Sequence, residues 1–244
     1  MRPSVAPSNV IQFIAVLMIA GGLKLYYSLA SVNDLYWVLA PTTFFVELIT
    51  GETFTFESFA GYMSEDHSFL IAAACSGVNF LITAFLMLSV SRLWKKRTEP
   101  LSLGLIPAAL AAAYLATLVA NTIRIAIALH IHRMEEPMVW VNPEQLHRFE
   151  GIFVYFGFLL LLYNLIEGLD EANELRSKRR IFGLRRSILP LLIYWVTTIG
   201  VPLANGAYHQ GASFWEHSAF IFITSLVLML PLSVINGLRI KYRT

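Results

Sequence analysis

Three side chains in this sequence combine residue types and positions that suit covalent chemistry. Cys75 is the only cysteine and lies near one end of an apolar stretch. Arg124 lies at the matching end of a later apolar stretch, and His147 stands at the start of another. A thiolate is a nucleophile, a guanidinium can stabilise a developing oxyanion, and an imidazole transfers protons near neutral pH. The residue types therefore predict cysteine-based catalysis at the surface of a membrane.

Cys75 has a simpler interpretation as a small buried hydrophobic residue, the common role of a free cysteine in an apolar helix. Its position near the start of the predicted helix favours a reactive role, because a helix N-terminus stabilises a thiolate. Ser76 and Gly77 follow it and leave space beside the sulfur. Asn79 is four residues on, a spacing that predicts the same helical face and a supporting hydrogen bond.

Arg124 has a simpler interpretation as an interfacial anchor. A charge deep in hydrocarbon costs about 2.5–3.5 kcal/mol on insertion scales, so an arginine near the end of a span needs a reason. Asn121 is three residues earlier on the same predicted face. The guanidinium is always charged and presents a fork of donors, which suits a carboxylate or an oxyanion.

Three histidines compete for the acid–base role, and His147 has the best position because Asn142-Pro143 reads as a helix start just before it. A metal site is the rival interpretation. It is disfavoured because residues i and i+2 lie on different faces of a helix and because no His-Glu-x-x-His motif is present. We therefore predict no metal and no other cofactor. The rival ligands are His130, His132, Glu135, Glu136 and His147.

The composition predicts an all-α, multi-pass transmembrane bundle. Hydrophobic residues make up 57% of the chain and charged residues 14%, whereas soluble domains carry about 25% charged residues. We expect one domain over residues 1–244, with each of six apolar stretches long enough to span a bilayer. The stretches are 9–30, 69–91, 101–123, 148–167, 188–206 and 216–237.

Basic residues predict the orientation of the bundle. Fourteen of the 18 Lys and Arg residues lie before the first stretch, between the second and third, between the fourth and fifth, or after the sixth. The positive-inside rule places these groups and both termini in the cytoplasm, and the three candidate residues outside. The basic loop 168–187 fits contact with anionic lipid better than nucleic acid.

Residues 28–30 resemble a signal-peptidase site, but the apolar run before them is long for a signal peptide, so we expect a retained helix.

Residues 34–49 are apolar and aromatic but interrupted by Pro41 and Glu47, which predicts a re-entrant or interfacial helix. Residues 51–57 alternate as a strand or hairpin would. This outer segment could cover the site or guide a substrate.

The candidate residues belong to three short blocks whose order and spacing resemble the exosortase/archaeosortase family of membrane cysteine transpeptidases, most closely the exosortase K subgroup. The resemblance covers about residues 40–170. It implies that Cys75 is the nucleophile, Arg124 the electrostatic stabiliser and His147 the acid–base group. Some relatives carry arginine at the third position, so Arg148 is the alternative there. The blocks are Cys75-Ser76-Gly77, Asn121-x-x-Arg124 and His147 followed by Gly151.

The resemblance implies a function in protein sorting. Family members cleave the C-terminal sorting signals of exported proteins outside the cytoplasmic membrane, through a thioester. Their substrates end in a short motif, a transmembrane helix and a basic tail. The motif, the acceptor, the balance between hydrolysis and transfer, and the oligomeric state stay open. The alternative is a transporter or assembly factor in which Arg124 binds an anionic group.

Overall fold

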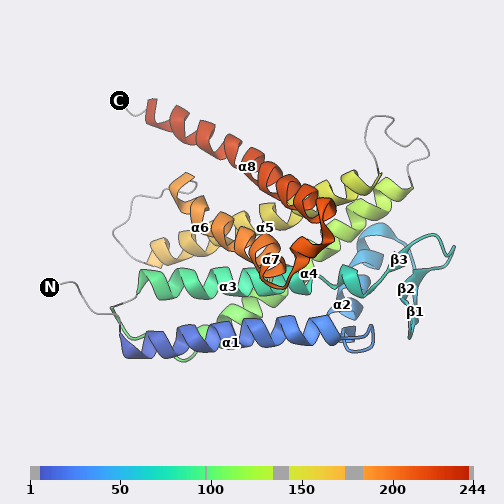
Figure 1. Ribbon diagram of the computed structural model, residues 1–244, viewed down its shortest axis with the longest axis horizontal. Coiled ribbons are helices and arrows are strands. Elements are labelled where there is room, and N and C mark those ends of the chain that lie inside the picture. Colours follow the sequence, from blue (N-terminus) through green and yellow to red (C-terminus); the bar gives the residue numbers. More distant parts are fainter. Residues whose placement is uncertain (1–5, 97, 134–142, 174–183, 242–244) are drawn as a thin grey trace. The chain divides into compact units, whose positions relative to one another are not determined.

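The computed structural model describes residues 6–96, 98–133, 143–173 and 184–241 (Figure 1). For 143–145, 147, 169–173, 184–186 and 231–241 it describes the backbone alone. Contacts divide the chain into two compact units, Met1–Glu150 and Gly151–Thr244, and each is considered by itself. The single domain expected from the sequence stays a prediction.

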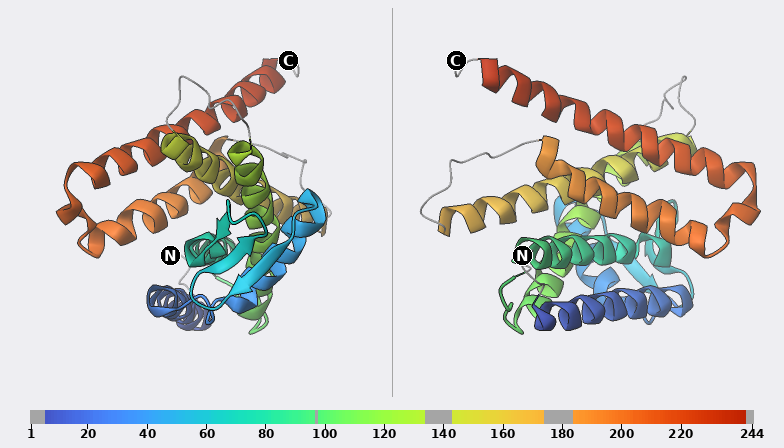
Figure 2. Two further views of the ribbon diagram at one scale, coloured as in Figure 1. Left: turned by 90° about the vertical axis from the view of Figure 1, so that its right-hand side faces the viewer. Right: turned by 60° about the vertical axis from the view of Figure 1, so that its left-hand side comes forward.

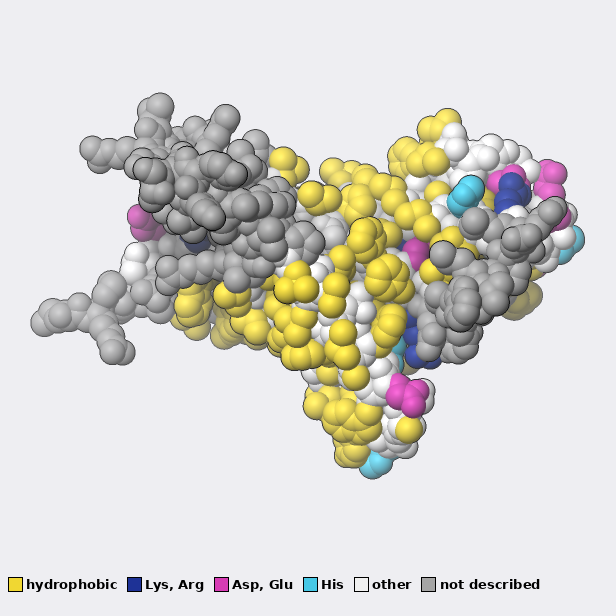
Figure 3. Space-filling view, turned by 90° about the horizontal axis from the view of Figure 1, so that it is seen from above, with side chains coloured by type: hydrophobic (Ala, Val, Ile, Leu, Met, Phe, Trp, Pro, Cys, Tyr) yellow, Lys and Arg dark blue, Asp and Glu magenta, His cyan; other side chains and the backbone are white. Residues whose placement is uncertain are grey.

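Six helices are long and apolar enough to cross a membrane, which confirms the predicted all-α transmembrane bundle. A helix suits hydrocarbon because it satisfies its backbone N–H and C=O groups internally. Apolar side chains make up most of the described surface seen in Figure 3, whereas charged side chains are few. The candidate spans are Pro7–Leu29, Ala73–Lys95, Leu105–His132, Arg148–Gly168, Ser187–Ala204 and Ala212–Leu230.

The first unit is built around one central helix, α3 (Val78–Lys95). Most residues of the span that contains α3 are buried, whereas most residues of α1 (Pro7–Leu29) are not. Both α1 and α4 (Leu105–His132) pack against α3, and α2 (Tyr36–Thr50) packs against α4 (Figures 1 and 2). Fully buried side chains on α3 include Phe85 and Met87, which place the core of this unit along that helix.

Polar side chains fasten the start of α1 to the connection between α3 and α4. The Asn9 amide donates to the carbonyls of Lys96 at 2.9 Å and Glu99 at 2.8 Å, and its oxygen accepts from the Leu101 N–H at 3.1 Å. Gln12 donates to the Leu101 carbonyl at 2.9 Å. These bonds give hydrogen-bond partners to backbone groups at the end of α3 and in the connection that follows it. Retention of α1 in the mature protein stays a prediction.

A helix, α2, is present where a re-entrant or interfacial helix is expected, and it continues through Pro41. Proline has no N–H, so the carbonyl of Trp37, four residues earlier, loses its helical partner. The Tyr114 hydroxyl donates to that carbonyl at 2.8 Å, and its ring stacks on the Trp37 ring with centroids 5.7 Å apart. A residue of α4 thus replaces the missing bond and allows the helix to continue.

The alternating segment after α2 forms a small antiparallel sheet, which confirms the predicted strand or hairpin. Its strands are β1 (Phe54–Glu57), β2 (Gly61–Ser64) and β3 (Leu70–Ile71), in the order β1-β2-β3. Gly61 pairs with the end of β1 and has φ of 132°. A Cβ there would collide with the carbonyl oxygen of Ile71, so the close approach of β3 requires glycine.

The second unit contains α5 (Pro143–Asn173) from Gly151 onward, followed by α6 (Leu184–Trp195) and α8 (Ala212–Lys241). Trp195 joins α6 to α8: its ring stacks on Phe222 with centroids 4.4 Å apart, and its N–H donates to the Ser225 hydroxyl at 2.8 Å. Between them lie a π-helical turn (Val196–Gly200), α7 (Val201–Ala204) and a 3₁₀ turn (Ala207–Gln210).

Candidate functional site

Cys75 lies in a short 3₁₀ helix, η1 (Ala73–Ser76), that precedes α3 and is separated from it by Gly77. Cys75 as a residue is partly exposed. Cys75 thus lies near the start of the span Ala73–Lys95, as expected, but in a 3₁₀ turn and not in the α-helix itself. The expectation that it shares an α-helical face with Asn79 is therefore wrong. The physical reason is the left-handed conformation of Gly77, whose φ is 75°.

Packing against α4 explains why the chain breaks at Gly77. A Cβ at this position would lie 3.0 Å from Cγ of Asn121 and 3.2 Å from Cγ2 of Thr117. Most residues tolerate a positive φ poorly, and the space beside α4 is closed to a side chain. Glycine is therefore required both by the backbone conformation and by the close approach of α4.

Asn121 joins the first two sequence blocks directly. Its side chain is fully buried, and its Nδ2 donates to the carbonyl oxygen of Cys75 at 2.6 Å. A buried amide of this kind fixes the backbone that it holds, because losing the bond would leave a buried polar group without a partner. Asn121 thus anchors the turn that carries the thiol to α4.

Asn79 forms its described hydrogen bond away from that turn. It is exposed near the start of α3, and Nζ of Lys24 in α1 donates to its Oδ1 at 2.8 Å. The Lys24 ammonium also lies 5.7 Å from the centre of the Tyr27 ring. The bond ties α1 to α3 near the Cys75 turn, and a role for Asn79 in supporting the thiol stays a prediction.

Arg124 lies on α4, one helical turn beyond Asn121, so its predicted helical position is confirmed. From Leu105 to Arg124 the helix rises about 29 Å at 1.5 Å per residue. A hydrocarbon core of about 30 Å that began at Leu105 would end close to Arg124, although the candidate span continues to His132. Arg124 is partly buried, and its Nε atom is fully buried.

Glu150 was missed by reasoning from the sequence. Its side chain is only 6% exposed, although it lies in the candidate span Arg148–Gly168. It belongs to the first compact unit, as Arg124 does. The signal in the sequence was an acidic residue inside a predicted apolar stretch, because ionisable groups in membrane spans are rare and usually functional.

His147 is the fifth residue of α5, which begins at Pro143 and confirms the predicted helix start. Its side chain lies outside the described part of the structure, so its convergence with Cys75 stays a prediction. Arg148, the alternative third group, is partly buried. Asn142, Glu135 and Glu136 fall in the segment that the structure does not describe.

The rival metal site draws no support from the described side chains. His130 and His132 lie on α4, and the ring of His132 packs edge-on against Phe69 with centroids 5.7 Å apart. Among the residues that could be searched, no three His, Cys, Asp or Glu side chains form a group suited to a metal ion.

Basic residues and Cys75 lie at opposite ends of α3. Arg92 and Lys95 occupy its last turn, and the Cys75 turn precedes its first residue. The 18 residues of α3 extend about 27 Å. This separation is what the positive-inside rule requires if the basic end is cytoplasmic and the thiol external.

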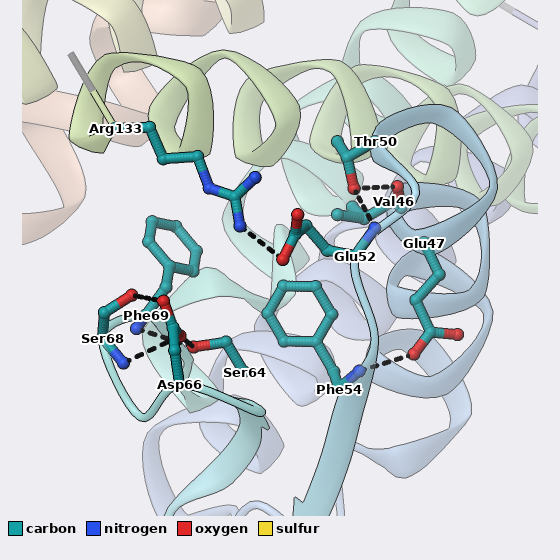
Figure 4. Close-up of polar contacts among 10 residues, drawn as sticks. All are labelled: Val46, Glu47, Thr50, Glu52, Phe54, Ser64, Asp66, Ser68, Phe69 and Arg133. Atoms are coloured by element: carbon teal, nitrogen blue, oxygen red, sulfur yellow. Dashed lines mark hydrogen bonds and ion pairs between the residues drawn. The ribbon is translucent and has the colours of Figure 1, made fainter.

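The small sheet is fastened to the end of α4 near this site. Arg133, which follows the last residue of α4, forms an ion pair with Glu52, and this bond raises the pKa of Arg133 (Figure 4). Asp66 accepts from the hydroxyls of Ser64 at 2.6 Å and Ser68 at 2.7 Å. These contacts hold the segment between α2 and η1 in one arrangement.

A pocket of about 250 Å³ opens beside this fastening, between the last turn of α2 and the last turns of α4. Apolar side chains form much of its wall, with an imidazole and a guanidinium at the polar side. It is lined by Ile49, Thr50, Ala126, Leu129, His130 and Arg133.

The turn between β2 and β3 is expected to loosen in acid. The hydroxyls of Ser64 and Ser68 hold the pKa of Asp66 well below its ordinary value of 3.8. A depressed folded-state pKa means that the stabilisation is complete above pH 3.8 and is lost as the pH falls toward the folded-state value. The protection factors of the Ser68 and Phe69 amides, meaning their exchange rates relative to an unstructured chain at the same pH, should therefore fall below about pH 4, and Asp66→Asn should show lower protection already at neutral pH. Unchanged protection in that variant would contradict the role given to Asp66.

Comparison of the chain with family models, with curated proteins and with solved structures found no match. The functional argument therefore rests on the geometry described above and on the three sequence blocks.

Proposed function

We propose that this chain is an exosortase-like membrane cysteine protease or transpeptidase. It cleaves the C-terminal sorting signals of exported proteins on the outer side of the cytoplasmic membrane. The observation that carries the proposal is the bond of 2.6 Å from Asn121 to the Cys75 carbonyl. It joins two sequence blocks that lie 46 residues apart, at the end of α3 opposite its basic residues.

The first half-reaction forms a thioester. His147 takes the thiol proton of Cys75, and the thiolate attacks the scissile carbonyl carbon. Arg124 stabilises the oxyanion of the tetrahedral intermediate. The C–N bond then breaks, and His147 gives its proton to the leaving amine, which carries the substrate's membrane helix and basic tail.

The second half-reaction releases the exported protein. An amine or a water molecule attacks the thioester carbonyl and loses a proton to His147. The C–S bond breaks, and the sulfur of Cys75 takes the proton back. An amine acceptor gives transpeptidation, and water gives hydrolysis.

Substrate geometry fits the length of the spans. A substrate helix that lies along the bundle with its basic tail at the basic end of α3 would bring the preceding motif to the level of Cys75. Holding the substrate in this way converts an encounter in two dimensions into a positioned reaction and lowers its entropic cost. Membrane lipid is thus a partner in this reaction, because it surrounds the substrate helix as well as the spans of the enzyme.

The proposal is tested by trapping the thioester. Membranes with the wild-type chain would be incubated with a tail-bearing reporter, meaning a protein that ends in a short motif, an apolar helix and a basic cluster encoded in the same genome. We expect an adduct that maps to Cys75 by mass spectrometry and is released by hydroxylamine, which cleaves thioesters. Failure of every such reporter to form this adduct would favour the alternative, a transporter or assembly factor in which Arg124 binds an anionic group.

A further inference from the structure

The pocket between α2 and α4 combines apolar walls with two side chains that can bind an anion. Its volume is about 250 Å³, and its polar lining includes His130 and Arg133. An imidazole donates an N–H in either protonation state, and a guanidinium has five donors and a permanent positive charge. Phosphate is an anion that such donors bind well. The lining therefore suits a phosphate group that is attached to something apolar.

The ion pair with Glu52 occupies only part of the Arg133 guanidinium. The terminal nitrogen Nη2 meets the Glu52 carboxylate, and Figure 4 shows the other terminal nitrogen pointing away from it. The Arg133 side chain is 47% exposed, so a ligand from outside the chain can reach its remaining donors. Glu52 therefore holds the guanidinium in place and also offsets part of its charge.

The pocket lies at the depth of lipid headgroups. The 28 residues of α4 extend about 42 Å at 1.5 Å per residue. A bilayer has a hydrocarbon core of about 30 Å, and the headgroup regions increase the total to about 40–45 Å. If the core begins at Leu105 it ends close to Arg124, so the pocket residues of α4, which lie within 126–133, stand at headgroup level and directly above it.

Exposed apolar side chains lead from the pocket along α2. Ile49 lines the pocket and is 62% exposed, and Phe45, one helical turn earlier, is 40% exposed. Near the other end of α2, the Trp37 ring stacks on Tyr114 of α4. Because Tyr114 lies about 14 Å along α4 from its first residue, α2 runs beside α4 from hydrocarbon depth up to the pocket. This flank of α2 can contact an acyl chain.

We propose that the pocket binds the phosphate of a membrane glycerophospholipid, in the leaflet at the Cys75 end of α3. Arg133 and His130 bind the phosphate, and an acyl chain lies on the flank formed by Phe45 and Ile49. Pockets for whole drug-sized ligands measure about 300–1,000 Å³. The volume of about 250 Å³ therefore suits a headgroup and leaves the acyl chains outside. The site goes beyond the proposed function and does not depend on the chemistry of Cys75.

Photocrosslinking of the purified protein in detergent tests the site. The probe is phosphatidylglycerol that carries a diazirine near the start of one acyl chain. Mass spectrometry measures labelling of the peptide that contains Phe45 and Ile49, and excess unlabelled phosphatidylglycerol should abolish it. Diacylglycerol with the same chains should compete at least about tenfold more weakly, because it lacks the phosphate. Glycerol 3-phosphate should also compete at least about tenfold more weakly, because it lacks the chains.

Arg133→Gln and Glu52→Gln form a matched pair, because both break the same ion pair but only the first removes the cation. Arg133→Gln should raise the concentration of phosphatidylglycerol that halves the labelling by about tenfold or more. Glu52→Gln should leave that concentration unchanged or lower it, since the competing carboxylate is gone. His130→Phe keeps a ring but loses the N–H donor, and it should raise the concentration by a smaller factor.

A distant cation controls for general attraction between a basic protein and an anionic lipid. Lys96 is exposed and follows the last residue of α3, at the end opposite the Cys75 turn. Lys96→Gln should therefore leave the competition at its wild-type value.

Several outcomes would overturn the lipid site. Absent labelling of α2 in the wild-type protein does so, and so does competition in Arg133→Gln that equals wild type. An equal loss in Glu52→Gln would show that the labelling depends on the ion pair and not on the cation. Diacylglycerol that competes as well as phosphatidylglycerol would show that the phosphate is not recognised. Glycerol 3-phosphate that competes as well would show a site for a free anion. None of these measurements uses processing of a reporter, so they are independent of the proposed function.

Discussion

Replacing Cys75 with serine is expected to reduce processing of a tail-bearing reporter by a factor of about a thousand or more. The two side chains are similar in size, so the η1 turn and its bond to Asn121 should remain. A serine hydroxyl is a far weaker acid than a thiol and stays protonated at neutral pH, so the attacking anion is lost. Gel mobility of the co-expressed reporter measures the effect.

A second variant on the same span serves as the control. Ser89 is a fully buried hydroxyl further along α3, and Ser89→Ala should keep both the abundance of the protein and the processing of the reporter. Wild-type processing by Cys75→Ser, at equal abundance, would remove Cys75 from the reaction.

Gly77→Ala is expected to give the largest structural effect near the site. Its φ of 75° strains any L residue, and the new Cβ would lie 3.0 Å from Cγ of Asn121. Relief of this contact moves the side chain that anchors Cys75. We expect the strain of about 1–3 kcal/mol that accompanies such a backbone, with a further cost of about 1–3 kcal/mol for crowding. Thermal unfolding of the purified protein in detergent measures the sum.

Gly51→Ala isolates the crowding contribution. Gly51 has φ of 73°, almost the same conformation, but no atom lies within 4 Å of the position that its Cβ would take. Both variants share the backbone strain, so the difference between them reports the contacts with Asn121 and Thr117. Equal destabilisation by the two substitutions would show that these two side chains move aside without cost.

Reasoning from the sequence succeeded where the membrane leaves few choices. A backbone in hydrocarbon must satisfy its own hydrogen bonds, so each long apolar stretch has to be a helix, and all six were found. The position of Arg124 on a helix followed from the apolar pattern that continues past it. The alternation of residues 51–57 likewise sufficed for a strand.

The failures involve contacts between residues far apart in the sequence. A glycine within an apolar pattern is compatible with a helix, and only packing against Thr117 and Asn121 forces Gly77 into the left-handed conformation. Pro41 looked like an interruption because the hydroxyl that compensates for it belongs to Tyr114, on α4. The burial of Glu150 likewise depends on packing between helices, which an apolar pattern does not encode.

The sheet outside the spans has a direct connection to the sulfur. Strand β3 ends at Ile71, and only Ala72 separates it from the turn that contains Cys75. The N–H of Cys75 donates to the carbonyl of that one alanine at 2.8 Å, so the linkage has little slack. A displacement of the sheet, such as one caused by binding at β1 or β2, would therefore also move the Cys75 turn. No membrane helix would have to bend for this to happen.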